Sequence, residues 1–301
     1  MAHAYTPGLK VTEKELVKKR RVLPLRGEVL VQEGTHVIPE QVVARTFLPG
    51  KIEIANIANK MSVDQSEVPL VMLKREGDRV EHGEIIAVSK SFFGLFKSQA
   101  TAPITGTIES ISGITGQVIL KGEPEPLQMR AYIEGTIVEV IPREGVVVET
   151  RGIFIQGIFG IGGETSGEIV MACESPHQVL DEERIKPEHK GKVVVGGSLV
   201  THAALREAIK LGASGVVTGG FDDEDLREFL GYDLGVAITG HEKLGITLIV
   251  TEGFGRIAMA PRTFELFAKH RGDRASINGA TQIRAGVIRP EVIIQISGAE
   301  A

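Results

Sequence analysis

The residues best placed to do chemistry stand in four glycine-containing segments of the C-terminal half. Each segment follows a short apolar run of the kind that forms a β-strand. Because the carboxyl ends of parallel strands meet at one edge of a sheet, the four segments predict a single ligand-binding crevice. Its candidate residues are Gly196, Gly197, Ser198, Gly219, Gly220, Thr239, His241, Thr251, Glu252 and Gly253.

A small anion is the ligand that such a crevice would suit. Free N–H groups and the helix dipole attract negative charge where a helix starts, and three of the segments precede predicted helix starts. The acidic run Asp222–Asp225 opposes an anion unless a divalent cation intervenes. The alternative is that the glycines only make tight strand–helix turns and the acids only cap a helix.

Other reactive groups give weaker patterns, so no catalytic residue and no cofactor are assigned. Cys173 stands four residues before His177 and could form a thiol–imidazole pair, but a buried, inert cysteine fits the same pattern. The histidines lack the His-x-His and His-x-x-x-His spacings of metal sites, so no metal site is predicted. Arg284 could bind a phosphate or carboxylate, or simply lie in a turn before a strand.

The elements that would position the crevice alternate between strands and helices. Apolar spacing predicts a helix over 201–212, with Thr201 as N-cap and Gly212 ending it, and further helices over 222–230 and 261–270. This alternation indicates a small α/β domain over 191–296, with a mostly parallel sheet of about four strands. Residues 175–190 are polar and contain two prolines, which predicts a linker.

Residues 27–174 have a different pattern, of short strands separated by glycine-containing turns and without an amphipathic helix. Two motifs in this part occur twice. Glu33-Gly34-Thr35-His36-Val37 is echoed by Glu76-Gly77-Asp78-Arg79-Val80, and Ala102–Ile108 is echoed by Ala131–Ile137. Repeated strand–turn–strand units of this size predict a small barrel or sandwich with internal pseudo-symmetry.

The stretch Glu76–Ala87, followed by Ala102–Ile108, resembles the biotinyl/lipoyl-type barrel-sandwich hybrid. That module occurs in carboxyl carriers, membrane-fusion adaptors and a family of Rnf-type electron-transport proteins. The resemblance covers about residues 70–120 and implies an all-β fold for 27–174. A carrier would need a modifiable lysine at a hairpin tip, for which Lys97 and Lys90 are the candidates, although neither has the usual flanking residues. The apolar run Phe92–Phe96 instead suggests a partly buried hairpin or a contact surface for a protein partner.

Composition and charge restrict the class of protein. The 301 residues are 42% hydrophobic and 24% charged, with no Trp and one Cys, which fits a globular chain with an aliphatic core and no internal disulfide. Residues 1–27 carry seven Lys/Arg and two Asp/Glu, a charge of +5, so the other residues sum to −10 against a total of −5. We expect residues 1–26 to be a solvated basic arm, and the acidic body argues against nucleic-acid binding.

The sequence therefore predicts an α+β protein in which an all-β barrel-sandwich hybrid precedes a small α/β domain. No apolar run is long enough for a membrane helix and no signal peptide is evident, so we expect a cytoplasmic location. The leading functional hypothesis is a non-catalytic binding or adaptor protein with a lipoyl-like module and an α/β ligand-sensing or docking domain. The alternative is an enzyme or cofactor-handling protein that acts on a small anionic ligand in the glycine-rich crevice.

Overall fold

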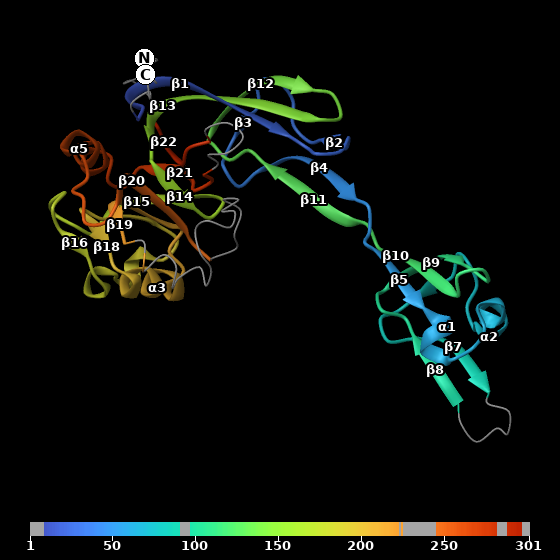
Figure 1. Cartoon of the computed structure of the whole chain (residues 1–301). Helices are drawn as coiled ribbons and strands as arrows, with labels where there is room; N and C mark the ends of the chain where they lie inside the picture. The colour runs from blue at the N-terminus through green and yellow to red at the C-terminus, as the bar shows by residue number, and fades with distance from the viewer. Residues whose placement is uncertain (1–8, 91–96, 223, 225–244, 282–287, 297–301) are drawn as a thin grey trace, which may run out of the picture. The chain divides into compact units, whose positions relative to one another are not determined.

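The computed structural model describes residues 9–90, 97–222, 224, 245–281 and 288–296, and the chain forms two compact units (Figure 1). Unit 1 comprises Met1–Val22, Val29–Ala44 and Met129–Ala301, and unit 2 comprises Leu23–Glu28 and Arg45–Gln128. The protein is a mixed α+β protein dominated by strands, as predicted. No helix among the described residues is long and apolar enough to cross a membrane.

This division differs from the predicted one, which placed a β domain at 27–174, a linker at 175–190 and an α/β domain at 191–296. Unit 2 lies within the predicted β domain except for Leu23–Arg26, which were assigned to the basic arm, and the boundary between the units falls inside β4 (Val42–Leu48) and β11 (Glu125–Arg130). The two units have separate cores, so a composition change along the chain was a poor guide to where the chain divides.

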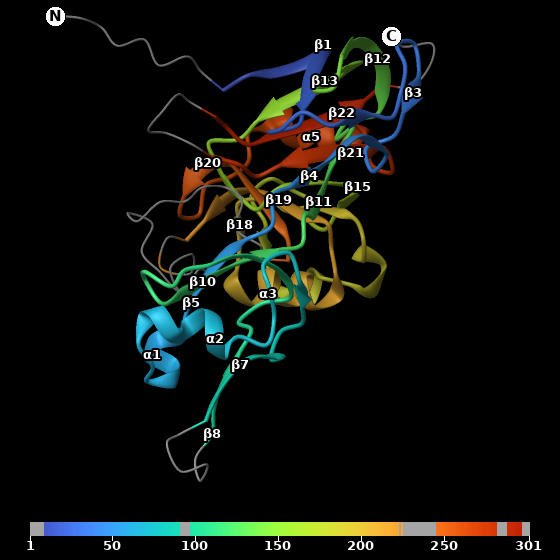
Figure 2. The same cartoon turned by 90° about the vertical axis from the view of Figure 1, so that its right-hand side faces the viewer.

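Unit 2 is built on a four-stranded antiparallel sheet in the order β5-β10-β9-β6, together with the hairpin β7–β8 (Figure 2). Only strands and turns were expected here, with no amphipathic helix, but the region also contains two short helices: α1, which Asn56 caps, and α2, which has Pro69 in its first turn. The elements are β5 (Ile52–Asn56), α1 (Ile57–Met61), η1 (Gln65–Glu67), α2 (Val68–Val71), β6 (Arg79–Val80), β7 (Ile85–Lys90), β8 (Lys97–Thr101), β9 (Gly106–Ile111) and β10 (Gln117–Gly122).

The repeated sequence motifs fold in the same way in both units. A left-handed glycine, Gly34 (φ 83°) or Gly77 (φ 90°), turns the chain into a two-residue strand, β3 (His36–Val37) or β6. These short strands pair with the second motif, β3 with β12 (Gly135–Ile141) and β6 with β9. The glycine N–H donates to the carbonyl of Ile137 in unit 1 and of Ile108 in unit 2, each at 2.8 Å. The two repeated motifs therefore pair with each other, and this pair occurs once in each unit. We call the pair, β3 with β12 in unit 1 and β6 with β9 in unit 2, the repeated frame.

The correspondence continues on both sides of this frame. The N–H groups of Leu30 and Leu73 donate at 2.8 Å to the carbonyls of Val43 and Ile86, which occupy equivalent positions. Strands β4 and β11, which cross the boundary between the units, are neighbours in the same way as β7 and β8 are in unit 2. Most of unit 2 (Arg45–Gln128) therefore lies in the chain between β4 and β11, at the place where unit 2 itself has the loop between β7 and β8. We call this arrangement a nested repeat.

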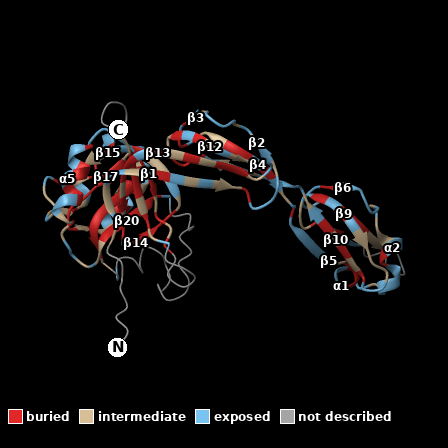
Figure 3. Ribbon diagram, turned by 90° about the horizontal axis from the view of Figure 1, so that it is seen from above, coloured by how far each residue is buried: buried red, intermediate tan, exposed pale blue. Residues whose placement is uncertain are grey.

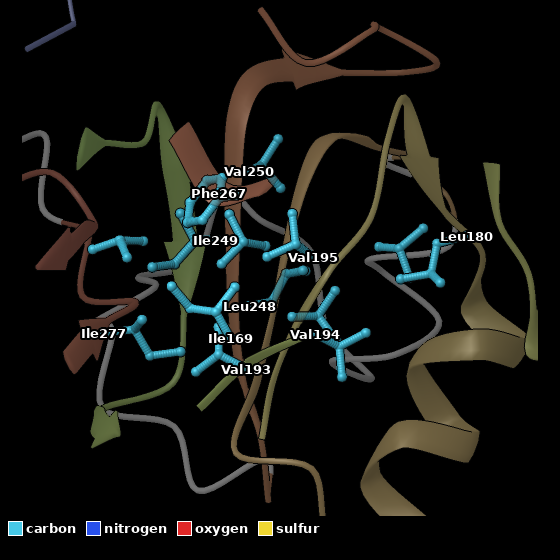
Figure 4. Packing of buried hydrophobic residues seen from close by; sticks show 14 of the residues in the cluster. Ile169, Leu180, Val193, Val194, Val195, Leu248, Ile249, Val250, Phe267 and Ile277 are labelled. Carbon is cyan, nitrogen blue, oxygen red and sulfur yellow. The ribbon is translucent and has the colours of Figure 1, made fainter. Parts of the chain in front are cut away.

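Unit 1 combines parallel and antiparallel strands in one sheet. The parallel part has the order β20-β19-β17-β15, from β15 (Glu164–Met171), β17 (Val193–Val195), β19 (Gly215–Phe221) and β20 (Thr247–Phe254). The parallel part is larger than the sheet of about four strands predicted over 191–296, because β15 comes before the predicted linker and because β16 (Val179–Leu180) and β18 (Leu199–Val200) form further parallel pairs. Its aliphatic side chains pack closely (Figure 4).

The predicted helix boundaries hold where the structure describes them. Helix α3 (His202–Leu211) has Thr201 as N-cap and Gly212 in the left-handed conformation, and α5 covers Pro261–Lys269. The helix expected over 222–230 lies mostly outside the described residues. The other elements of unit 1 are β14 (Phe159–Ile161), β16 (Val179–Leu180), η2 (Glu182–Arg184), η3 (Pro187–His189), β18 (Leu199–Val200), β21 (Arg274–Asn278) and β22 (Glu291–Gln295).

The long strand β13 (Gly145–Gln156) links the repeated frame of unit 1 to its α/β part. Val146 and Val148 belong to the core of the frame, whereas Ile153 and Ile155 point to the opposite face and belong to the α/β core. Strand β13 pairs with β12 in its first half and with β22 in its second half. The alternation of buried and less buried residues along it is visible in Figure 3.

The basic N-terminal residues do not form the expected solvated arm. Val11–Val22 form strand β1, which pairs antiparallel with the whole of β13 (Figure 1). Three of the five cations of this strand pair with the acidic body. Lys18 contacts Glu149 at 2.9 Å, Lys19 donates to Glu291 at 2.7 Å, and Arg21 binds the Glu164 carboxylate with two nitrogens. The basic lead and acidic body noted in the sequence are therefore complementary charges within one unit.

Tyr132 is at the centre of these contacts and has an unusual backbone, with φ at 69°. Its hydroxyl donates to Glu291 at 3.0 Å, and the Arg21 guanidinium lies 5.3 Å from its ring centroid. Burial, reinforced by the Glu291 charge, raises the pKa of Tyr132 well above its usual value, so the hydroxyl stays protonated and acts as a donor. This cluster fastens β1 to the sheet.

We expect Arg21→Ala to destabilise the protein by about 3 kcal/mol, because it leaves Glu164 unpaired and removes the cation from Tyr132. Its Nε–H bond to the Arg130 carbonyl is lost as well. The neighbouring Arg20 is exposed, so Arg20→Ala is the matched control and should change stability by no more than about 0.5 kcal/mol. Urea unfolding of both variants measures the difference. Equal stability of the two would contradict the assigned role of the cluster.

The segment 175–190 is not the extended linker that we predicted. It contains β16 and two 3-10 turns, and it buries Leu180, Ile185 and His189. His189 Nδ1 accepts the Lys186 N–H at 3.2 Å, which requires an unprotonated nitrogen. Burial lowers the pKa of His189 below its usual value of 6.5. The segment is rich in polar residues because most of its side chains are at least partly exposed to solvent, while Leu180, Ile185 and His189 pack inward.

A buried neutral His189 gives stability a defined pH dependence. The unfolded chain takes up the proton near pH 6.5 and the folded chain only at lower pH, so this contribution is present above pH 6.5 and is lost as pH falls through the folded pKa. His189→Asn keeps an acceptor but cannot titrate. Urea titrations between pH 8 and pH 5 should show the wild type losing more stability on acidification than this variant. Parallel pH profiles would show that His189 is not buried as described.

Candidate functional site

The structure brings together most of the predicted crevice residues at the carboxyl edge of the parallel strands. The chain after β17 lies against β19, since the Gly219 N–H donates to the Gly197 carbonyl at 2.8 Å. The Ser198 hydroxyl donates to the His177 carbonyl at 2.9 Å. Gly196 N–H donates to the Val217 carbonyl, also at 2.8 Å. These groups therefore meet as predicted, but they bond to the protein itself.

The glycines in these loops are explained by close backbone packing. A Cβ on Gly197 would lie 2.4 Å from the Gln178 carbonyl oxygen, and one on Gly219 would lie 2.3 Å from the Ile257 carbonyl oxygen. At Gly220 the Gly255 carbonyl oxygen would be only 1.9 Å away. Neighbouring backbone thus occupies the space in front of these three glycines. This supports the alternative in which they make tight turns, and an anion site at these loops stays a prediction.

Three of the remaining crevice residues have structural roles, and the other two lie outside the described residues. The Thr251 hydroxyl donates to the Thr218 carbonyl at 3.2 Å, and Glu252 accepts the Ala260 N–H at 2.9 Å just before α5. Gly253 has φ at 155°, next to the end of β20. Thr239 and His241 lie outside the described residues, as does Arg284.

The other reactive side chains do not form a catalytic group in the described chain. Cys173 is buried, and its Sγ is 4.0 Å from the Gln178 carbonyl oxygen. Burial raises the pKa of Cys173, which disfavours the thiolate that a nucleophile requires. Among the described residues no group of three or more His, Cys, Asp and Glu is arranged to hold a metal ion.

A concave polar site that the sequence did not predict lies beside the middle of β13, where the pairing with β12 ends and the pairing with β22 begins. We call it the notch, and it has a volume of about 240 Å³. Arg151 and Thr136 line the notch, and no described residue forms a hydrogen bond or ion pair with the exposed Arg151 side chain. Its other lining residues are Leu16, His36, Gly135, Glu149, Thr150, Gln295 and Ile296.

A second hollow of about 170 Å³ adjoins the notch and shares Leu16, Arg151 and Ile296 with it. Lys14, Glu15 and Gly152 complete its lining. Leu16 is 50% exposed, although it is an aliphatic side chain in the middle of a strand. The sequence offered no local signal for this site, because its residues come from five strands (β1, β3, β12, β13 and β22) that are far apart in the chain, and from Ile296 after β22.

We expect Gly220→Ala to destabilise the protein by about 3 kcal/mol or more, because the new methyl group would overlap the Gly255 carbonyl. Gly163→Ala is the control, since a Cβ there meets nothing within 4 Å, and it should change stability by less than about 1 kcal/mol. Thermal and urea unfolding measure both. A Gly220→Ala protein as stable as the control would show that these loops are more open than described.

The chain has no significant match among family models, curated proteins or solved structures. Its function must therefore be argued from its own residues, and two features of the described chain stand out. One is the repeated frame with the exposed surface of unit 2, and the other is the notch in unit 1.

Proposed function

We propose that this protein is a non-catalytic binding or adaptor protein whose unit 2 docks a protein partner. The proposal retains the lipoyl-like, barrel-sandwich nature of the β module as an inference. Its support is the resemblance of residues 70–120 to that module and the repeated frame of short strands around left-handed glycines. The observation that carries the proposal is the amount of apolar surface that unit 2 exposes.

Eight of the fifteen large apolar side chains that are exposed in the described chain belong to unit 2, which is much the smaller unit. Soluble proteins rarely leave contiguous apolar surface uncovered unless it serves an interaction. The eight residues are Leu25, Phe47, Ile52, Ile54, Leu70, Leu73, Ile85 and Ile114.

One group of these residues forms a continuous surface on the four-stranded sheet. Ile52 and Ile54 are 62% and 57% exposed, and they project from the same face of β5 because they are two residues apart. Ile119 of β10 lies directly across from Ile54 and is partly exposed as well. The opposite face of these strands carries the buried Val118, and the outer side combines Ile52, Ile54 and Ile119 with the polar Lys121, which lies across from Ile52. We call the outer side the β5 face (Figure 3).

A second exposed group lies at α2. Leu70 is 84% exposed and Ile114 is 86% exposed. The two segments are adjacent, since a Cβ on Gly113 would lie 3.4 Å from the Pro69 side chain. A short helix and a turn thus present two aliphatic side chains to solvent, which matches a surface for protein contact better than one for a polar small molecule.

Two other readings remain as alternatives. A carrier would bear a modified lysine, but the Lys97 side chain and the Phe92–Phe96 contact surface lie outside the described residues. An enzyme or cofactor-handling protein would use the crevice loops. In the structure, neighbouring backbone atoms occupy the space next to Gly197, Gly219 and Gly220 of these loops. A cytoplasmic location fits an adaptor and is part of the proposal. Intact mass of the natively expressed protein would reveal a carrier by its added group.

We expect a photo-crosslinking side chain placed at Ile54 to yield one defined protein adduct in the native cell, identified by mass spectrometry. The physical reason is that a partner seated on the β5 face would bury this position. Glu109 of β9 is an exposed position of the same unit and serves as the control site.

The specificity of that adduct decides the proposal. Ile52→Lys puts a charge on the same face and should abolish the Ile54 adduct without changing the melting temperature. The proposal fails if the adducts at Ile54 and Glu109 are the same, if no protein adduct forms, or if Ile52→Lys leaves the adduct intact.

A further inference from the structure

The nested repeat allows one position of unit 1 to be compared with its counterpart in unit 2. In unit 2, Arg79 of β6 forms an ion pair with Glu123, just after β10. The corresponding residues of unit 1 are His36 of β3 and Arg151 of β13. This equivalence follows from matching pairs, since Arg79 lies across from Thr107 and His36 across from Thr136. Where unit 2 has a cation and a carboxylate, unit 1 has an imidazole and a guanidinium.

The equivalence of Glu123 and Arg151 is supported by the glycine that precedes each Thr. A Cβ on Gly106 would lie 2.1 Å from the Lys121 carbonyl oxygen, and one on Gly135 would lie 2.2 Å from the Glu149 carbonyl oxygen. Lys121 and Glu149 therefore occupy the same place in the frame, and Glu123 and Arg151 both follow two residues later. Unit 1 thus lacks the carboxylate that unit 2 places at this point.

The carboxylates near the notch already have partners. Glu149 is paired with Lys18 at 2.9 Å. Glu134 lies 3.3 Å from His36 Nε2, and the Gln295 amide, oriented to donate, reaches both of its oxygens at 2.9 and 3.1 Å. Arg151 is the lining cation without such a partner in the described chain. The notch therefore presents an unneutralised guanidinium, and the adjoining hollow adds Lys14.

The walls around Arg151 indicate the rest of the ligand. Leu16 and Ile296 line both the notch and the adjoining hollow, so aliphatic surface lies next to the guanidinium. The planar guanidinium matches a carboxylate through two parallel hydrogen bonds, and burial of CH₂ groups against Leu16 and Ile296 adds hydrophobic stabilisation. We propose that the notch binds a small carboxylate with a short aliphatic chain, whose charged group pairs with the Arg151 guanidinium.

Calorimetry with hexanoate at constant ionic strength tests this site on the full chain. We expect saturable binding of hexanoate to the wild type, and at least tenfold weaker binding to Arg151→Gln, which keeps a long side chain but removes the charge. Arg206→Gln, at an exposed arginine of α3, is the matched control and should bind as the wild type does. Arg151→Glu supplies the missing carboxylate from the protein and should abolish binding.

The other probes define the ligand class. Hexylamine and hexan-1-ol, which keep the chain but lack the carboxylate, should not bind, and inorganic phosphate should bind far more weakly than hexanoate. The melting temperatures of all variants are measured first, and the exposed position of Arg151 predicts little change. The proposal is overturned if hexanoate does not bind, if Arg151→Gln binds it as the wild type does, or if phosphate or hexylamine binds equally well. Because the site lies in unit 1, none of these results bears on docking by unit 2.

Discussion

Strand β13 is the element on which unit 1 depends, because its two faces belong to two different cores. Val146 and Val148 fill the core of the repeated frame, and Ile153 and Ile155 fill the α/β core. A strand can do this only if its residues alternate strictly, since a shift by one position would turn every apolar side chain to the wrong side. Pairing with β1 along its whole length holds that register. The notch forms on the same strand, at the point where β12 ends its pairing and β22 begins.

The repeated frame depends on backbone geometry more than on side-chain identity. Gly34 and Gly77 adopt positive φ, which allows the tight turn into a two-residue strand. Gly106 and Gly135 are required for another reason, since a Cβ at either would overlap a carbonyl of the adjacent strand. The two copies share these backbone features while their exposed residues differ. Different ligands or partners for the two units are therefore compatible with one frame.

Charge in unit 1 is arranged around the N-terminal strand. Lys18, Lys19 and Arg21 each pair with a glutamate of the acidic body, and Tyr132 connects two of these pairs at a backbone conformation that costs free energy. A strand at the edge of a sheet gains protection from wrong pairing when it carries such cations. Arg151 lies on the same face of the sheet as Lys18 and Leu16 but has no carboxylate partner among the described residues, and the proposed ligand would provide one.

Local backbone preferences were sufficient to predict the features that depend on a few neighbouring residues. The Thr201 cap, the Gly212 stop and the turns at Gly34 and Gly77 follow from backbone preferences within one or two turns of chain. The alternation of strands and helices also indicated the parallel layer. The repeated motifs could also be recognised in the sequence, but the sequence did not show that the two motifs pair with each other within each unit.

The division of the chain and the pairing of distant groups depend on long-range contacts. The frame of unit 1 is assembled from 29–44 and the chain after 129, with unit 2 between them, so no window of sequence contains it. Arg21 and Glu164 are 143 residues apart, and their pairing turned a presumed arm into a strand. The crevice glycines suggested space for a ligand, but neighbouring backbone atoms occupy the space next to Gly197, Gly219 and Gly220. Such contacts depend on the distances between distant segments, which local preferences do not encode.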